Sequence, residues 1–356
     1  MNYTLIKNLA HGARHGIRQK PLNSSTEIRL TRLCTQRCRQ CQVYERRTEP
    51  ASMDLALFRR VAAALKEYGA YIGFISGGEA TLVPDLPEIL LEAKKVFPVA
   101  TTLVTGLYNK SETIRDIGRF CLDHDINIQT SLDGLGETGD ILRGARDFSA
   151  TVLRHMEMIA AMRGSSQSLL YANIVLSRLN LGQIPEIIAR ARDIGWRVTI
   201  GLYHHLTETT REDEDLSLQP GPELDELLAF LDHNPDILNL NSFIRGIAPF
   251  IASGETTRCP FVASRFLMTR LTIMENGDVH LCWGGPVGNL FANSMQEIFS
   301  SPAYRQRLDE YAQCRGCWTT CYTQRYLLIR PRSLREGADN LRKMMRMRRI
   351  QKGAMR

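Results

Sequence analysis

The sequence predicts a parallel α/β fold followed by a smaller second region. Six strand patterns alternate with helical patterns between residues 27 and 232, as in a parallel sheet with right-handed crossovers. After about residue 235 the alternation stops, and Asn-Pro, Ala-Pro and Ser-Gly pairs indicate irregular chain. A chain of 356 residues is long enough for two domains, or for one α/β barrel with an appendage.

Local patterns predict the elements in order. Residues 27–33 alternate in polarity as a strand does, and Ser52 precedes an amphipathic helix that ends near Tyr68. Further strands are expected at 71–75, 99–104, 126–131, 169–176 and 197–202, and further helices at 87–96, 111–123, 148–162, 181–193 and 222–232. In the second region, residues 266–273 and 279–282 flank Glu-Asn-Gly-Asp, which predicts a hairpin because Asn-Gly supplies the positive φ of a type I′ turn.

The composition is that of an ordinary globular protein, with 44% hydrophobic and 23% charged residues. There is no run of eighteen apolar residues, and the N-terminus lacks the apolar core of a secretory signal. The nine cysteines are therefore expected in a reducing cytoplasm, where clustered cysteines bind metal more readily than they form disulfides.

Positive charge is concentrated at the C-terminal end. Residues 330–356 contain ten Lys or Arg and two acidic residues, whereas the whole chain has a net charge of +7. This tail is suited to nucleic acid, an acidic peptide or an anionic membrane surface, and the alternative is a solvated terminus without a partner.

Cys34, Cys38 and Cys41 follow the first strand at spacings of four and three. Their thiolates suit an iron–sulfur cluster or zinc, and three ligands would leave one iron of a cubane open. The same spacing also forms one face of a helix, on which cysteines often simply pack. This loop, Gly77-Gly78-Glu79 and the Ser131–Gly134 segment all follow strands, so one active site is expected at that rim.

With these motifs the chain resembles the radical S-adenosylmethionine (SAM) enzymes. The resemblance implies that Cys34, Cys38 and Cys41 hold a [4Fe-4S] cluster whose open iron is chelated by SAM, and that reduction cleaves SAM to a 5′-deoxyadenosyl radical. The residue before the third cysteine is usually aromatic in that family, and here it is Gln40. This difference alters packing near the adenine and leaves the ligand set intact.

The resemblance also implies further SAM contacts. The loop Gly77-Gly78-Glu79 resembles the glycine-rich loop whose backbone receives the SAM amino group, since a backbone without Cβ can approach a ligand closely. Ser131 resembles the residue that binds the ribose, and Arg143 resembles the arginine that pairs with the methionine carboxylate. The alternatives are an ordinary strand-to-helix turn for the glycines and an exposed helix-start residue for Arg143.

The C-terminal part resembles the SPASM/twitch type of auxiliary-cluster domain. This implies one auxiliary [4Fe-4S] cluster, since five cysteines can fully ligate only one. The cysteines are Cys259, Cys282, Cys314, Cys317 and Cys321. Whether Cys314 or Cys321 is the additional thiol stays open, and a structural zinc ribbon is the rival interpretation.

Together these resemblances imply a partial (β/α)6 TIM-like barrel followed by a small α/β extension with a β-hairpin. The expected division is a basic segment at 1–26, the barrel at 27–235, the auxiliary domain at 236–329 and the basic tail at 330–356. The expected activity is hydrogen abstraction from a peptide or small molecule, with the auxiliary cluster supporting oxidation or crosslinking. The residues do not identify a catalytic acid or base, since SAM binding or turn structure accounts for both Asp133 and Glu79.

The expected partners are SAM, an electron donor such as flavodoxin or ferredoxin, and the substrate. Many peptide-modifying relatives carry a winged-helix leader-binding domain, for which the first 26 residues are too short, so peptides and small molecules are both expected. Two alternatives stay open. One is a radical SAM enzyme that acts on a lipid-linked or RNA substrate through the basic termini, and the other is a non-enzymatic zinc protein that binds nucleic acid.

Overall fold

A computed structural model describes most of the chain. The described residues are 23–43, 51–203, 215–254, 269–282, 284–314 and 316–321, with the single positions 323, 327, 335, 338 and 342. No helix among them is long and apolar enough to cross a membrane.

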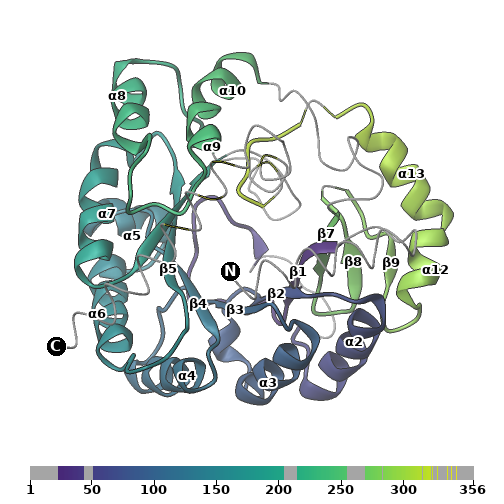
Figure 1. Ribbon diagram of the computed structural model, residues 1–356. Coiled ribbons are helices and arrows are strands. Elements are labelled where there is room, and N and C mark those ends of the chain that lie inside the picture. Colours follow the sequence, from purple (N-terminus) through teal and green to yellow (C-terminus); the bar gives the residue numbers. More distant parts are fainter. Residues whose placement is uncertain are drawn as a thin grey trace.

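A single curved sheet organises the described part of the molecule (Figure 1). Its strands are β1 (Asn23–Arg29), β2 (Ile72–Ser76), β3 (Ala100–Val104), β4 (Asn127–Ser131), β5 (Leu170–Leu176), β6 (Arg197–Leu202), β7 (Thr269–Ile273), β8 (Asp278–His280) and β9 (Gly288–Asn289). They are ordered β6-β5-β4-β3-β2-β1-β7-β8-β9. The strands from β6 to β7 pair in parallel, and β8 and β9 are antiparallel additions. The sheet is thus an unclosed partial barrel with C-terminal strands at one edge, which confirms the predicted fold class.

Helices cover the outer face of this sheet. They are α2 (Leu55–Tyr68), α3 (Leu86–Val96), α4 (Ser111–Asp123), α5 (Gly136–Arg143), α6 (Phe148–Ala161), α7 (Ile184–Asp193), α8 (Pro222–Leu231), α9 (Asn241–Arg245), α10 (Ile247–Ser253), α12 (Met295–Ser300) and α13 (Pro302–Tyr311), with 3-10 turns at Ala80–Leu82 and Leu181–Gln183. Figure 1 shows α2, α3, α4, α6 and α7 along the convex side, while α12 and α13 lie beside the β7–β9 end.

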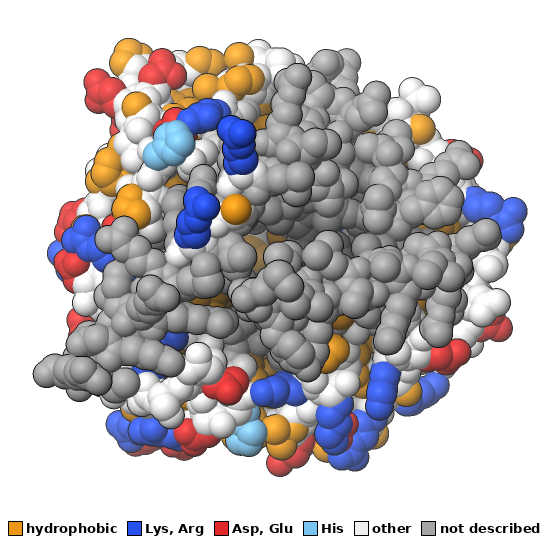
Figure 2. Space-filling view, in the orientation of Figure 1, with side chains coloured by type: hydrophobic (Ala, Val, Ile, Leu, Met, Phe, Trp, Pro, Cys, Tyr) orange, Lys and Arg blue, Asp and Glu red, His pale blue; other side chains and the backbone are white. Residues whose placement is uncertain are grey.

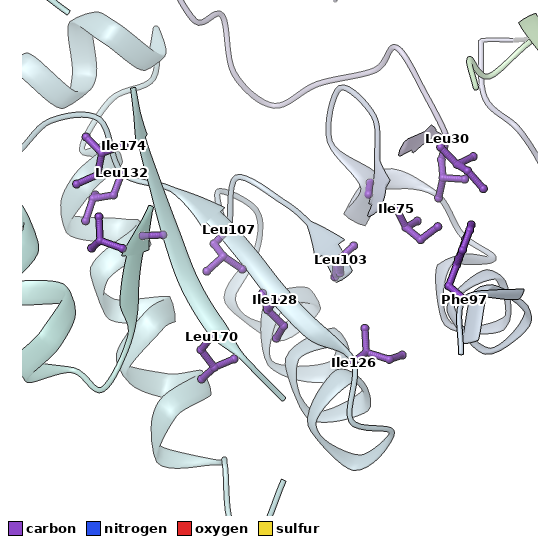
Figure 3. Close-up of a cluster of buried hydrophobic side chains, with 14 of the residues drawn as sticks. Leu30, Ile75, Phe97, Leu103, Leu107, Ile126, Ile128, Leu132, Leu170 and Ile174 are labelled. Carbon is purple, nitrogen blue, oxygen red and sulfur yellow. The ribbon is translucent and has the colours of Figure 1, made fainter. Parts of the chain in front are cut away.

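The local sequence accounts for these helices, as α2 illustrates. Asp54 accepts a hydrogen bond from the Leu57 amide and begins the helix, and Gly69 ends it in the left-handed conformation that glycine adopts without strain. Its buried residues recur with helical spacing and pack onto the sheet. Figure 3 shows outward-facing strand residues such as Ile75, Leu103 and Ile128 within this core.

The predicted strands and helices of the barrel are present, with ends that differ by a few residues. The first strand is shifted toward the N-terminus, at Asn23–Arg29, and the chain from Leu30 onward already forms the cysteine loop. Helix α5, which the sequence patterns did not indicate, follows β4 directly. Strand β7 was expected in a separate extension, but it pairs in parallel with β1 as part of the same sheet.

The predicted hairpin is confirmed by the antiparallel pairing of β7 and β8, but the predicted type I′ turn is wrong. The Gly277 amide donates to the Met274 carbonyl, and Gly277 has a φ of 83° while Asn276 does not have a positive φ. The loop is therefore a three-residue connection with glycine in the left-handed position. Asn276 favours this form because its side-chain oxygen accepts from the Asp278 amide, which holds the turn from within.

Candidate active site

A cavity of about 190 Å³ lies at the carboxyl ends of the barrel strands. Most of the site residues that the sequence predicts for the barrel line it: Cys34, Cys38, Cys41, Gly77, Gly78, Ser131 and Arg143. Five further lining residues follow from the fold rather than from the motifs, namely Gln36, Val43, Val104, Thr105 and Gly106, and Gln40 completes the wall. Residues far apart in the sequence therefore meet at one rim of the sheet, as predicted.

One side of the cysteine loop is fixed against the Gly-Gly-Glu loop. The Gly78 amide donates to the Thr31 carbonyl at 2.6 Å, and the Glu79 amide donates to the Leu33 carbonyl at 2.8 Å. A Cβ atom on Gly78 would lie 2.3 Å from the Leu33 carbonyl oxygen. The glycine is thus required for the close approach of these two backbones.

The other side of the cysteine loop is fixed by the end of helix α5. The Arg37 amide donates to the Arg143 carbonyl at 3.2 Å, and the Arg39 amide donates to the Leu142 carbonyl at 3.0 Å. These carbonyls are among those that an α-helix leaves without partners at its C-terminus. Gly144 follows with a φ of 55°, and a Cβ there would lie 2.2 Å from the Arg37 carbonyl oxygen. The loop therefore caps α5 while α5 positions the loop.

The Arg143 side chain faces the cysteines and is buried, with 8% exposed. This corrects the alternative of an exposed residue at a helix start, since Arg143 is the last residue of α5 and points inward. Its Nη1 lies 3.7 Å from the Cys38 sulfur, and its Nη2 forms an ion pair with the Asp133 carboxylate at 2.5 Å. Its Nε is buried and has no hydrogen-bond partner.

Asp133 joins three elements at the cavity wall. One carboxylate oxygen accepts from the Val175 amide at 2.8 Å, at the end of β5. The other oxygen accepts from Arg143 and from the Gln40 side-chain amide, the latter at 3.4 Å. The side-chain oxygen of Gln40 is buried without a partner, beside the cavity. Asp133 is 1% exposed, so its role is to hold neighbouring groups in place.

Glu79 is also engaged by neighbouring residues rather than by the cavity. One carboxylate oxygen accepts from the Thr81 amide and hydroxyl and from the Thr105 hydroxyl at 2.6 Å, and the other accepts from the Gly106 amide at 2.8 Å. The carboxylate thus ties the loop after β2 to the loop after β3. This favours turn structure as the role of the Glu79 side chain.

Burial disfavours thiolate formation in the cysteine loop. It raises the pKa of the Cys34 thiol to about 12, despite a hydrogen bond from the Gln36 amide. Burial also raises the pKa of the Cys38 thiol, and the Arg143 guanidinium opposes this effect. A nearby cation, such as the iron of a cluster, would favour the thiolate forms of Cys34 and Cys38.

The second cysteine region lies beyond β7. Tyr311 holds two of its cysteines together: its hydroxyl accepts from the Cys282 amide at 3.0 Å, and its carbonyl accepts from the Cys314 amide at 3.0 Å. Cys317 and Cys321 follow in a segment anchored by Trp318, whose indole nitrogen donates to the Phe243 carbonyl at 2.9 Å. Cys259 lies outside the described residues. Within the described ranges, no three Cys, His, Asp or Glu side chains converge tightly enough to hold a single metal ion.

Two family models match the chain. Residues 28–218 match the radical SAM superfamily, and residues 265–318 match an iron–sulfur cluster-binding domain known as SPASM. The first match contains the whole cavity, and the second contains Cys282, Cys314 and Cys317. Both matches favour iron–sulfur chemistry over the zinc interpretation.

Characterised relatives are peptide-maturing proteins by name. The chain is 29% identical over 168 residues to the PqqA peptide cyclase of Gluconobacter oxydans, which is 47% of this chain and 45% of that protein. It is also 20% identical to the subtilosin biosynthesis protein AlbA of Bacillus subtilis, over 294 residues that make up 81% of this chain and 62% of that protein. The chain thus spans only about half to three-fifths of these relatives.

Solved structures share the fold. SuiB of Streptococcus suis aligns with a TM-score of 0.61 at 14% identity, covering 87% of this chain and 74% of SuiB. The anSMEcpe protein with bound AdoMet and the Cp18Cys peptide aligns with a TM-score of 0.58 at 15% identity, covering 93% of this chain and 99% of that protein. At these identities the likeness concerns the architecture alone.

Proposed function

The chain belongs to the radical SAM superfamily, and from this membership we propose that it is a SPASM-type enzyme that modifies a peptide. One observation carries the proposal: a single cavity is lined by the three clustered cysteines, both glycines of the Gly-Gly-Glu loop, Ser131 and Arg143. The matched SPASM region and the peptide-maturing relatives support the same reading.

The family implies a [4Fe-4S] cluster with SAM in the barrel, and the SPASM match implies auxiliary iron–sulfur chemistry. When bound, the cluster and SAM supply a 5′-deoxyadenosyl radical that removes hydrogen from the substrate. The residues present fit these groups. Three thiols face one cavity, and a buried guanidinium N–H and a buried amide oxygen beside them have no partner.

In this proposal Cys34, Cys38 and Cys41 hold the barrel cluster, and other parts of the chain fix the conformation of their loop. Its backbone is fixed on both sides, since it bonds to the Gly-Gly-Glu loop and to the end of α5. A loop held by such contacts loses less conformational entropy when it binds a ligand than a free loop does. We assign Gly77, Gly78 and the Glu79 backbone to the SAM amino group, and Ser131 to the ribose.

We assign the second cluster to Cys259, Cys282, Cys317 and one further cysteine. Tyr311 accepts hydrogen bonds from the amides of both Cys282 and Cys314, and this shared neighbour supports Cys314 as the ligand and Cys321 as the additional thiol. The proposed division of the chain stays at 1–26, 27–235, 236–329 and 330–356. A flavodoxin or ferredoxin is the proposed electron donor.

The alternative substrates depend on the basic termini. Residues 1–22 lie outside the described residues, as does most of the tail from 330 to 356. On the described lower rim of the face in Figure 2, Lys and Arg side chains are interspersed with Asp and Glu. An RNA or lipid-linked substrate therefore has less support than a peptide.

The chemistry is tested by anaerobic incubation with SAM and dithionite. The wild type is expected to form 5′-deoxyadenosine, and a variant with Cys34→Ala, Cys38→Ala and Cys41→Ala is expected to form none. Cys121→Ala is the matched control because Cys121 is buried on α4, away from the cavity, and it should retain the activity. Equal 5′-deoxyadenosine yields from the triple variant and the wild type would contradict the proposal.

The substrate class needs a separate experiment. The enzyme is co-expressed with each short peptide encoded next to its gene, and the peptides are examined by mass spectrometry. A peptide that loses hydrogen mass with the wild type, but not with the triple-cysteine variant, supports peptide modification. If no peptide changes mass while 5′-deoxyadenosine still forms, the radical chemistry stands and the peptide assignment is wrong.

A further inference from the structure

Resting on the proposed function, we propose that Arg143, positioned by Asp133, raises the reduction potential of the barrel cluster through its contact with Cys38. This role is additional to the contact with the SAM carboxylate that the family resemblance implies for Arg143. The juxtaposition that carries the inference is a buried cation that faces a proposed cluster ligand.

The geometry places one guanidinium nitrogen toward sulfur. Arg143 Nη1 lies 3.7 Å from the Cys38 sulfur, and both side chains are buried. Hydrogen bonds to the sulfurs and the local net charge are among the factors that set the potential of an iron–sulfur cluster. A cation here stabilises the reduced cluster, which carries one more negative charge than the oxidised one. Arg143 therefore makes the electron easier to accept.

The orientation of Arg143 is set by the protein. Its Nη2 forms an ion pair with Asp133 at 2.5 Å, and its guanidinium lies over the Phe148 ring, 5.6 Å from the centroid. Asp133 is itself fixed by the Val175 amide at 2.8 Å, and its backbone carbonyl accepts from Asn180 at 2.7 Å. Contacts within the protein thus hold the arginine against Cys38.

The same geometry limits what Arg143 offers to SAM. A bidentate pair with a carboxylate uses two parallel N–H groups of one guanidinium. Here Nη2 is occupied by Asp133 and Nη1 faces sulfur, which leaves Nε, buried and without a partner, as the available donor. Asp133 thus engages one of the guanidinium nitrogens that a bidentate pair with the SAM carboxylate could use.

The test is a redox titration of the anaerobically reconstituted full-length protein without SAM, followed by electron paramagnetic resonance of both clusters. Arg143→Gln is expected to shift the barrel-cluster potential to more negative values, and Arg143→Lys, which keeps the charge, should restore part of the shift. The reduction potential of the auxiliary cluster should not change in either of these variants.

Arg146→Gln is the matched control, since its side chain is 94% exposed and lies only three residues away. It should leave both potentials unchanged. The inference is overturned if Arg143→Gln has the wild-type potential without SAM and only its SAM affinity falls, because Arg143 then acts on SAM alone. It is also overturned if the barrel-cluster potential of Arg143→Lys is as negative as that of Arg143→Gln, which would indicate a structural effect.

Iron and sulfide analysis separates this inference from the proposed function. A wild type that binds neither would overturn the proposed function itself. If only Arg143→Gln fails to assemble the cluster, Arg143→Met is titrated in its place, and a wild-type potential in that variant overturns the inference.

Discussion

The two cysteine regions are held by different kinds of contact. Cys34, Cys38 and Cys41 lie on one short loop, whose backbone bonds to the Gly-Gly-Glu loop on one side and to the end of α5 on the other. The described cysteines of the second region come from the hairpin and from the segment after α13, and side chains such as Tyr311 and Trp318 hold them. The first region depends on close backbone approach, whereas the second depends on large side chains.

This difference predicts different sensitivities. A backbone contact fails when a Cβ atom is added, while a side-chain contact fails when atoms are removed. The following predictions test whether the two regions respond separately, in order of expected effect.

Gly78→Ala should have the largest effect, and it should act on the first region. The new Cβ would lie 2.3 Å from the Leu33 carbonyl oxygen, so the two loops must separate. We expect a loss of about 3 kcal/mol in the free energy of unfolding, the upper end for overpacking. Iron in the barrel cluster should fall while the auxiliary iron stays. Gly182→Ala is the control, since its nearest neighbour, a Glu223 carboxylate oxygen, is 3.8 Å away.

Trp318→Ala should act on the second region. The indole stacks on Phe243 and Phe250, with ring centroids 5.8 and 6.2 Å apart, and donates to the Phe243 carbonyl. Because Trp318 is half-buried, we expect a cost slightly below the usual range for such truncations, about 2–3 kcal/mol. Auxiliary iron should be lost while the barrel cluster still cleaves SAM. Trp318→Phe should retain most of the stability, and equal loss of both clusters would mean that the regions are not separate.

Glu27→Gln tests whether the pairing of β1 with β7, which joins the two regions in one sheet, contributes to the stability of the protein. Glu27 on β1 forms an ion pair with Arg270 on β7 at 2.7 Å and a longer one with Arg29 at 3.3 Å. Burial opposes ionisation, but both guanidinium groups outweigh it and lower the pKa of Glu27 from 4.5 to about 2. The depressed pKa stabilises the folded state above pH 4.5, and this stabilisation is lost as the pH falls toward 2.

At pH 7 we therefore expect Glu27→Gln to cost about 2 kcal/mol in the free energy of unfolding, a discounted value for a shift of this size. Denaturant unfolding at several pH values provides the measurement. The difference between wild type and variant should narrow below pH 4.5, where the wild-type carboxylate begins to lose its advantage. A difference that does not depend on pH would contradict this account.

Ser294→Ala should have the smallest effect. Ser294 and Glu297 form a capping box at the start of α12, next to the second region. Loss of the cap should cost about 1 kcal/mol and should leave both iron contents unchanged. Ser165→Ala, at an exposed loop position, is the control and should not alter the unfolding midpoint.

The sequence predicted the fold well where the patterns are local. Strands and helices of the barrel are set by short periodic segments, and the cysteine loop is contiguous, so its place after the first strand could be predicted. The pairing of Ile28 with Ile273 joins residues far apart in the chain, and no local pattern indicates it. Helix α5 was missed because its sequence, Gly-Glu-Thr-Gly-Asp-Ile-Leu-Arg, has two glycines and few apolar residues.

The sequence predicted which residues form the site, but it predicted the contacts between them less well. The cavity gathers the expected cysteines, glycines, Ser131 and Arg143. Two sets of contacts depend on how separate elements meet in the fold. The Glu79 side chain bonds to Thr105 and Gly106, and Arg143 is buried between Asp133 and Cys38. In the sequence, this second set of contacts is indicated only by the presence of an acidic residue, Asp133, two positions after Ser131.

The docking of the cysteine loop on α5 sets an order for biosynthesis. Cys38 and Arg143 are 105 residues apart in the chain, so the cysteines leave the ribosome long before the helix end that fixes their loop. Until residue 144 has been synthesised, Arg37 and Arg39 have no carbonyls of α5 to bond to. Iron delivered to the nascent chain before that point would meet a loop held on one side only, so under the proposed cluster assignment we expect iron loading after α5 has folded.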